Sequence, residues 1–239
     1  FDLFLSNSGD DFAVMGMHFK LGLYEHQSAG ALQAMLTLLT AHPELIADPN
    51  GKNIDKIVIV AYEPAFGIIG DPAKRNPTTR QSADHSMLYI VATLLRKAIE
   101  KKAVGWEALM LEPDDYGPAA IKNAFTRELM DKITFQHGGP EYDAKYPDGI
   151  PTSVIITARG GTEHDSGLVM YPGGHARNAS APHPVNLKAV LAHKFQLLGA
   201  LAFDNPQPII DRYSNLEKKS AQDIQTIHDY ELTIKGKFD

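Results

Sequence analysis

The chain has 239 residues, of which 44% are hydrophobic and 22% charged, so it is long enough to bury one good core or two modest ones. Its formal net charge of −6 argues against a nucleic-acid partner, and no apolar run approaches the length of a membrane span, so we expect no membrane partner. The absence of cysteine excludes disulfides, thiolate nucleophiles and an iron–sulfur cluster held by cysteines of this chain.

The chain opens with Phe1-Asp-Leu-Phe-Leu, without a methionine, and we expect it to be a piece of a longer protein. Apolar residues at helical spacing predict a first helix over residues 24–40. A short β-rich run at 56–62 predicts a strand, and a loop rich in proline, glycine and asparagine follows it.

The segment RQSADHSMLYIVATLL, residues 80–95, predicts an apolar helix with charged residues at its start. Ser82 and Asp84 are the expected N-cap residues. Arg80 and His85 would then lie near free backbone N–H groups and the positive end of the helix dipole, which favour an anion. The expected buried stripe consists of Leu88, Val91, Leu95 and Ala98.

Further along, the pattern predicts a helix over residues 118–131 and a strand over 132–136. Two β-rich runs, 153–157 and 167–171, flank Gly160-Gly161 and predict a hairpin. The last long helix is predicted to present an apolar face that consists of Leu187, Val190, Leu191, Phe195 and Leu198.

The order of these elements is a helix, a β-α-β-β unit and then further helices, which predicts an α+β fold. We expect residues 1–51 to end a helical domain and form a junction, and residues 52–172 to form an inserted α+β domain. Residues 173–239 would supply C-terminal helices that return to the helical domain.

Three segments carry candidate functional side chains. Arg80, Asp84 and His85 combine an arginine that can hold a carboxylate with a histidine that can move a proton near neutral pH. Alternatively, Asp84 caps the helix and pairs with Arg80, while His85 is simply buried. Lys20 and His26, in FKLGLYEHQSAGAL, could both face a cleft, or they could be a solvated lysine and a capping histidine.

The third segment is YPGGHAR, residues 171–177, where a tight turn would project His175 and Arg177. It could also be an ordinary connection with exposed polar side chains. The sequence has no HExxH and no close histidine pair at ligand spacing, so we predict no metal ligands, and it lacks GxSxG, Walker and GxGxxG motifs. The acidic pairs Asp10-Asp11 and Asp114-Asp115 are typical of solvated loops.

Together these segments resemble the 2-methylcitrate dehydratase family, also called MmgE/PrpD. The family fold is a large all-helical domain with a smaller α+β lid, and its members are considerably longer than this chain. The resemblance therefore implies that the chain is the C-terminal half, with most of the helical domain and several active-site residues missing. It rests on FKLGLYEHQSAGAL, on Asn76-Pro-Thr followed by RQSADHSMLYIVATLL, on YPGGHAR, and on Lys194-Phe195 inside a helix.

The resemblance also implies roles for single residues. Lys20 matches the family's active-site lysine, and His26 matches the histidine that begins the next helix. It implies catalytic roles for Lys20, His26 and His85. It implies substrate binding by Arg80, Asp84, His175 and Arg177.

The implied reaction removes water from 2-methylcitrate to give 2-methyl-cis-aconitate, without an iron–sulfur cluster or other cofactor, in propionate catabolism. The family implies a tricarboxylate as the substrate and a homodimer, and we expect a cytoplasmic protein, or a mitochondrial one in a eukaryote. One alternative is a related decarboxylase or epimerase that acts on a di- or tricarboxylate. The related decarboxylases carry a tyrosine upstream of the Asp-His pair, and residues 66–71 have none. Another alternative is a catalytically silent carboxylate-binding domain.

Overall fold

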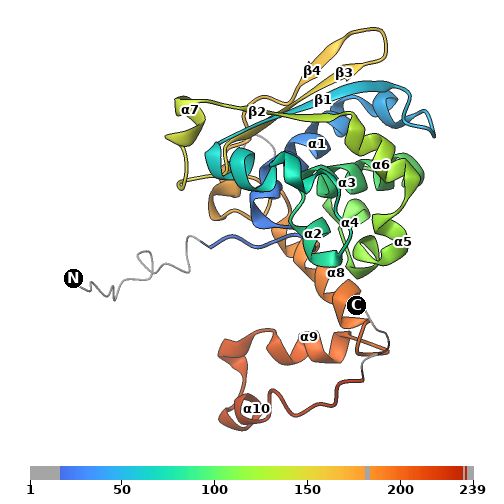
Figure 1. The fold of residues 1–239 in the computed structure, drawn as a ribbon. Helices are drawn as coiled ribbons and strands as arrows, with labels where there is room; N and C mark the ends of the chain where they lie inside the picture. The colour runs from blue at the N-terminus through green and yellow to red at the C-terminus, as the bar shows by residue number, and fades with distance from the viewer. Residues whose placement is uncertain (1–16, 181–183, 234, 236–239) are drawn as a thin grey trace.

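The computed structural model describes residues 17–180, 184–233 and 235. They form a mixed α/β arrangement in which helices pack against a small four-stranded sheet (Figure 1). The strand order is β2-β1-β3-β4, with β1 parallel to β2 and antiparallel to β3, and β3 antiparallel to β4. The strands are β1 (Ile54–Ala61), β2 (Ile133–His137), β3 (Thr152–Ala158) and β4 (Glu163–Asp165).

Helices precede, interrupt and follow this sheet. The α-helices are α1 (Ala29–Ala41), α2 (Arg80–Asp84), α3 (Met87–Lys101), α4 (Trp106–Leu109), α5 (Pro118–Ile121), α6 (Ala124–Asp131), α7 (Pro140–Asp143), α8 (Leu187–Gly199), α9 (Gln207–Tyr213) and α10 (Ala221–Gln225). Single turns of other helix types are η2 (His26–Ser28), η3 (Pro43–Ile46), η4 (Ala65–Ile69), η5 (Pro72–Arg75), η6 (Pro113–Tyr116), η7 (Ala176–Ser180) and η8 (Leu216–Lys218).

The centre of the sheet is held by apolar residues that face one another across the strands. Ile57 of β1 is paired with Ile133 of β2 on one side and with Ile156 of β3 on the other. Side chains in register on neighbouring strands lie on the same face of a sheet, so these three share one face. All three are fully buried there. Burial of each contributes about 1.5–3 kcal/mol.

Helices α1, α3 and α6 cover this face (Figure 1). Helix α1 packs on β3, and α3 packs on both α1 and α6. Gly30 of α1 lies so close to β3 that an added Cβ would come within 2.5 Å of the Thr152 Oγ1. One continuous hydrophobic core therefore joins α1, α3 and the sheet. The domain boundaries that the sequence placed after residues 51 and 172 stay a prediction.

Most expected elements are confirmed, with β1, β2, β3 and α8 close to the predicted residues. The helix predicted from residue 80 is instead two helices. The Thr79 side chain caps α2 and that of Ser86 caps α3, so the expected caps Ser82 and Asp84 are wrong. Each hydroxyl group accepts a hydrogen bond from a backbone N–H in the first turn, which has no partner within the helix.

Two further corrections concern local breaks in the chain. The helix predicted over 118–131 is divided into α5 and α6, because Asn123 starts a new helix by accepting the Thr126 N–H. The second strand of the expected hairpin is β4, and the segment 167–171 meets β3 only at one bridge, between Thr152 and Val169.

Helix α8 leads away from the sheet toward α9 and α10 (Figure 1). Of its predicted apolar face only Val190 is fully buried, while Phe195 is 62% exposed. Within the described ranges, no helix combines the length and apolarity that a bilayer span requires.

Candidate functional site

The segment that carries Lys20 and His26 bends at residues 21–24 and is held by other parts of the chain. The Phe19 N–H donates to the Gly174 carbonyl at 2.8 Å, and the Leu23 N–H donates to the Leu111 carbonyl at 2.9 Å. The Lys194 Nζ, on α8, donates to the Lys20 carbonyl at 2.6 Å. Parts of the chain that are far apart in sequence therefore fix the backbone of this segment.

The turn in YPGGHAR needs glycine at one position for a steric reason. Gly174 has a φ of +90°, and an added Cβ would lie 2.0 Å from the Phe19 carbonyl oxygen. Glycine alone allows this approach of two backbones. The preceding Gly173 N–H donates to the Gln33 Oε1, which also accepts from the Trp106 indole. The turn thereby places His175 beside the segment that carries Lys20.

Three histidines meet at this junction. The ring of His18 lies 3.7 Å from that of His175 and 5.0 Å from that of His26, centroid to centroid. Tyr171 stacks obliquely on His175 at 4.7 Å. The predicted residues His26 and His175 thus belong to one cluster, together with His18, which the sequence did not single out.

These imidazoles are held in their neutral form. Burial, together with the neighbouring His18, lowers the pKa of His175 to about 4. Burial also lowers the pKa of His26, with contributions from His18 and Lys20, and burial alone lowers that of His18. A neutral imidazole near pH 7 can accept a proton at one nitrogen and donate from the other.

The tautomer of His175 follows from one hydrogen bond. The Arg177 backbone N–H donates to the His175 Nδ1 at 3.0 Å, so the proton of a neutral ring is on Nε2. That Nε2 is buried and has no hydrogen-bond partner among the described residues. His175 therefore offers a buried N–H donor that a ligand could use.

The Arg177 side chain is itself already paired. Its guanidinium forms an ion pair with Asp148 and lies over the Tyr171 ring at 5.6 Å. The Tyr171 hydroxyl also donates to the Asp148 carboxylate at 2.9 Å. The expected substrate-binding Arg177 is thus neutralised by Asp148, and its closest link with the histidine cluster is its backbone N–H.

Glu25 connects the histidine cluster with the α2–α3 junction. Its carboxylate accepts the Gln27 N–H at 2.9 Å. Burial raises the pKa of Glu25; the Gln27 N–H, His85 and Lys20 oppose this shift, and Asp84 adds to it. The charges of His85, Lys20 and Asp84 are therefore close enough to act on one carboxylate, which joins two segments predicted separately.

At the junction itself, Asp84 ends α2 and His85 follows it. The His85 Nδ1 lies 3.5 Å from the Asp84 carboxylate, and the His85 side chain is 54% exposed. The alternative of a buried His85 is therefore wrong. Arg80 makes no ion pair with Asp84, and its Nε is buried without a partner among the described residues.

Two further side chains near Glu25 or Lys20 were not predicted as site residues. Tyr62 is buried and stacks on Tyr146 with 4.7 Å between ring centroids. Burial raises the pKa of Tyr62, and Tyr146 and Glu25 raise it further. Burial and the charge of Lys20 lower the pKa of Lys194. The sequence carried a signal for Lys194 and for His18: Lys194 is part of the Lys194-Phe195 pair, and His18 directly precedes the motif FKLGLYEHQSAGAL. Tyr62 had no such signal.

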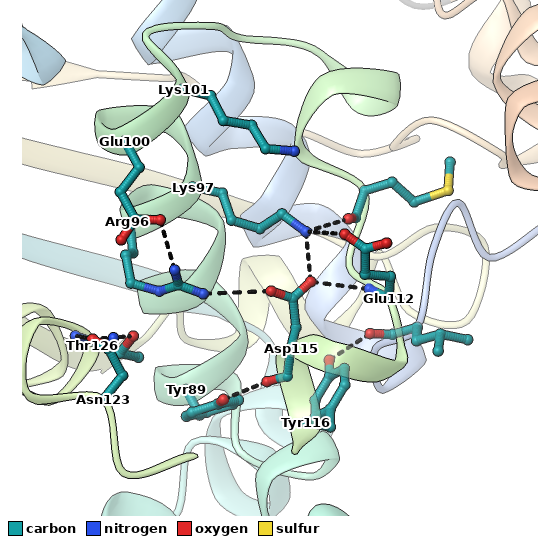
Figure 2. Close-up of polar contacts among 12 residues, drawn as sticks. Tyr89, Arg96, Lys97, Glu100, Lys101, Glu112, Asp115, Tyr116, Asn123 and Thr126 are labelled. Carbon is teal, nitrogen blue, oxygen red and sulfur yellow. Dashed lines mark hydrogen bonds and ion pairs between the residues drawn. The ribbon is translucent and has the colours of Figure 1, made fainter. Parts of the chain in front are cut away.

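A buried ion-pair network joins α3 to the connection between α4 and α5 (Figure 2). The Lys97 Nζ lies 2.5 Å from the Asp115 carboxylate and donates to the Met110 carbonyl at 2.7 Å. Arg96 approaches the second Asp115 oxygen at 3.4 Å. Asp115 is therefore buried and paired, which corrects the expectation of a solvated Asp114-Asp115 loop; Asp10 and Asp11 lie outside the described residues.

The network reaches the site through the residue after Asp115. The Tyr116 hydroxyl donates to the Leu23 carbonyl, in the segment between Lys20 and Glu25 (Figure 2). The Glu112 N–H, beside Leu111, donates to the Asp115 carboxylate at 3.0 Å. The ion pairs on α3 therefore fix the connection between α4 and α5, which contacts this segment through Leu111 and Tyr116.

The fold and this cluster define an α/β domain that gathers lysine, carboxylate and neutral imidazole groups at one place. The family model described as the MmgE/PrpD C-terminal domain matches residues 24–207, and the chain belongs to this family. The match confirms the family expected from the motifs, while the particular member stays a prediction. Members of the family are generally enzymes, and the match suggests a hydro-lyase or a related function. A comparison with curated proteins found no match.

Proposed function

We propose that this chain carries part of the active site of a hydro-lyase that dehydrates 2-methylcitrate to 2-methyl-cis-aconitate. The observation that carries the proposal is the single cluster formed by Lys20, Glu25, His26 and His175, with His85 in electrostatic range. Family membership supports the reaction class.

The lysines suit a substrate with several carboxylates. Lys194 donates to the Lys20 backbone, and the charge of Lys20 is close enough to lower the Lys194 pKa. Two neighbouring cations repel each other, and a bound carboxylate relieves this repulsion. Arg80, whose Nε has no hydrogen-bond partner in the part of the chain that the structure describes, is the proposed partner of a further carboxylate.

Dehydration then needs a base for the proton next to a carboxylate and an acid for the departing hydroxyl group. In our proposal a histidine, His26 or His85, takes the proton from carbon, and the new double bond forms as the C–O bond breaks. The buried His175 Nε2–H donates a hydrogen bond to the leaving oxygen, and the imidazolium formed on the base passes its proton to that oxygen, which departs as water. Asp84 orients His85, and Arg177 positions His175 through its backbone N–H.

The proposal also covers the context of the reaction. The described sheet and its helices would form the lid over a larger helical domain, and closure would exclude water during the step. The enzyme would work without a cofactor, as a homodimer, in cytoplasmic or mitochondrial propionate catabolism.

The test is turnover of 2-methylcitrate by the full-length protein in the presence of a chelator, followed by the ultraviolet absorbance of the conjugated product. Citrate and cis-aconitate serve as control substrates. Lys20→Met and His85→Gln should each lower kcat/KM by about 100-fold or more. The matched variants Lys122→Met and His137→Gln change side chains outside the cluster and should keep the wild-type value.

The outcomes distinguish the alternatives. Release of carbon dioxide from cis-aconitate, without dehydration of 2-methylcitrate, would favour a decarboxylase. Inversion of a stereocentre without a conjugated product would favour an epimerase. Tight tricarboxylate binding without any reaction would favour a silent binding domain, and each of these results would contradict the dehydratase.

A further inference from the structure

A second group of candidate ligands lies at the other end of α1. His42, Glu44 and His164 place one donor atom each within 4.8 Å of one another. The His42 Nδ1 lies 3.2 Å from the Glu44 Oε1, and the rings of His42 and His164 are 3.9 Å apart, centroid to centroid. Among the described residues no other group of three or more histidine, aspartate or glutamate side chains meets this spacing.

The fold brings these three residues together from two distant parts of the chain. His42 directly follows α1, where its N–H donates to the Leu38 carbonyl at 2.8 Å, and Glu44 lies in the adjoining turn η3. His164 is the middle residue of β4 and pairs with Ile156 of β3. Because Ile156 is fully buried, His164 is on the face of the sheet that α1 covers.

The turn that carries Glu44 is also fixed. The Asn53 side chain donates to the Glu44 carbonyl at 2.7 Å, and the Asn53 carbonyl accepts the Arg159 N–H at 2.8 Å. This links η3 with the start of β1 and the end of β3. The Glu44 side chain is 63% exposed, so one side of the group stays open to water.

The donor set and spacing match a first-row divalent cation. Two imidazole nitrogens and one carboxylate oxygen are common ligands of zinc, with bonds of about 2.0–2.2 Å. Ligands at that distance around a tetrahedral ion lie roughly 3.3 Å apart. The observed 3.2 Å between the His42 and Glu44 donor atoms is close to this value. From this geometry we propose that His42, Glu44 and His164 bind a zinc-like divalent cation, with water in the remaining position.

The site is separate from the candidate active site. Helix α1 has 13 residues and is therefore roughly 20 Å long, with His26 before its start and His42 after its end. A cation there would link the end of α1 to β4 and stabilise the edge of the sheet. The proposal therefore does not depend on the reaction catalysed at the other end.

The test is calorimetric titration of Zn²⁺ into tag-free, chelator-treated full-length protein, with Co²⁺ absorbance as a second readout of the ligands. We expect one ion per chain at this site, and an affinity at least roughly tenfold weaker in His42→Ala and in His164→Ala. Zn²⁺ should also raise the Tm of the wild type, because a ligand of the folded state stabilises it. This rise should be lost in His164→Ala.

Two variants serve as controls. His137→Ala removes a histidine that also lies near two carboxylates, with its Nε2 3.1 Å from Asp143 and 3.5 Å from Glu63, and it should leave the affinity unchanged. His26→Ala removes a ring of the active-site cluster. Loss of zinc binding in His26→Ala but not in His42→Ala would place the ion at that cluster and overturn the proposal.

Absence of binding up to millimolar Zn²⁺ would also overturn it, and the contact between His42 and Glu44 would then be a hydrogen bond only. If a histidine variant fails to fold, as judged by circular dichroism, Glu44→Gln replaces it. That side chain is largely exposed, so the substitution removes the carboxylate ligand without disturbing the core.

Discussion

The buried ion pair between Lys97 and Asp115 gives a quantitative prediction for the stability of the fold. Asp115 is 6% exposed and accepts hydrogen bonds or ion pairs from Lys97, Arg96 and the Glu112 N–H. In Asp115→Ala the Lys97 ammonium keeps Glu112 at 3.2 Å and the Met110 carbonyl but loses its closest anion. Removal of one partner from a buried pair costs about 3–5 kcal/mol. Because Glu112 still offsets part of the Lys97 charge, we expect a loss near the lower end of this range, about 3 kcal/mol.

This cost can be measured by urea denaturation followed by circular dichroism. For a chain of this size it corresponds to a decrease in Tm of roughly 10 °C. Asp114→Ala is the matched control, because the neighbouring Asp114 is exposed and its loss should change the free energy of unfolding by less than about 0.5 kcal/mol. Lys97→Met combined with Asp115→Ala should recover part of the loss, since no unpaired ammonium remains.

The reasoning fails if Asp115→Ala and Asp114→Ala differ by less than about 1 kcal/mol, a typical single-substitution effect. It also fails if the double variant is no more stable than Asp115→Ala. Either result would mean that water or other groups replace the Asp115 carboxylate without cost.

Three further predictions concern packing, pH and substrate binding. Gly30→Ala should destabilise the fold by about 1–3 kcal/mol in the same denaturation assay, because the added Cβ would meet β3. Gly117→Ala is the control: the atom nearest to its added Cβ is 3.5 Å away, so this variant should be neutral or slightly stabilising. The unfolded chain binds a proton at His175 near pH 6.5, but the folded chain binds it only near pH 4, so the free energy of unfolding should fall as the pH decreases between these values. His175→Asn should flatten this pH dependence. An unchanged profile of stability against pH would contradict the low pKa of His175. Lys194→Met should raise the KM for the tricarboxylate by roughly tenfold or more, because a charge-assisted contact is lost. Lys188 is exposed, and Lys188→Met should leave the KM unchanged. Equal KM values for the two variants in steady-state kinetics would show that Lys194 is not part of the binding site.

Local patterns in the sequence determined the elements and the motifs. The apolar spacing in α1, α3 and α8 and the β-rich runs in β1 and β2 were sufficient to predict these elements, because helix and strand periodicity depends on neighbouring residues. The motifs that contain Lys20, His26, Asp84, His85 and His175 were also visible in the sequence, and the family match over residues 24–207 covers these positions except Lys20.

Only the tertiary structure decided which of these residues meet, and in which protonation state. Asp114 and Asp115 are indistinguishable in the sequence, but hydrogen bonds from side chains of α3 to Asp115 bury this residue, whereas Asp114 is exposed. His42 and His164 are far apart along the chain and meet because β4 returns beside the end of α1. The burial that lowers the pKa of His175 likewise comes from segments distant in sequence. Long-range contacts depend on the whole packed chain, and no local pattern contains them.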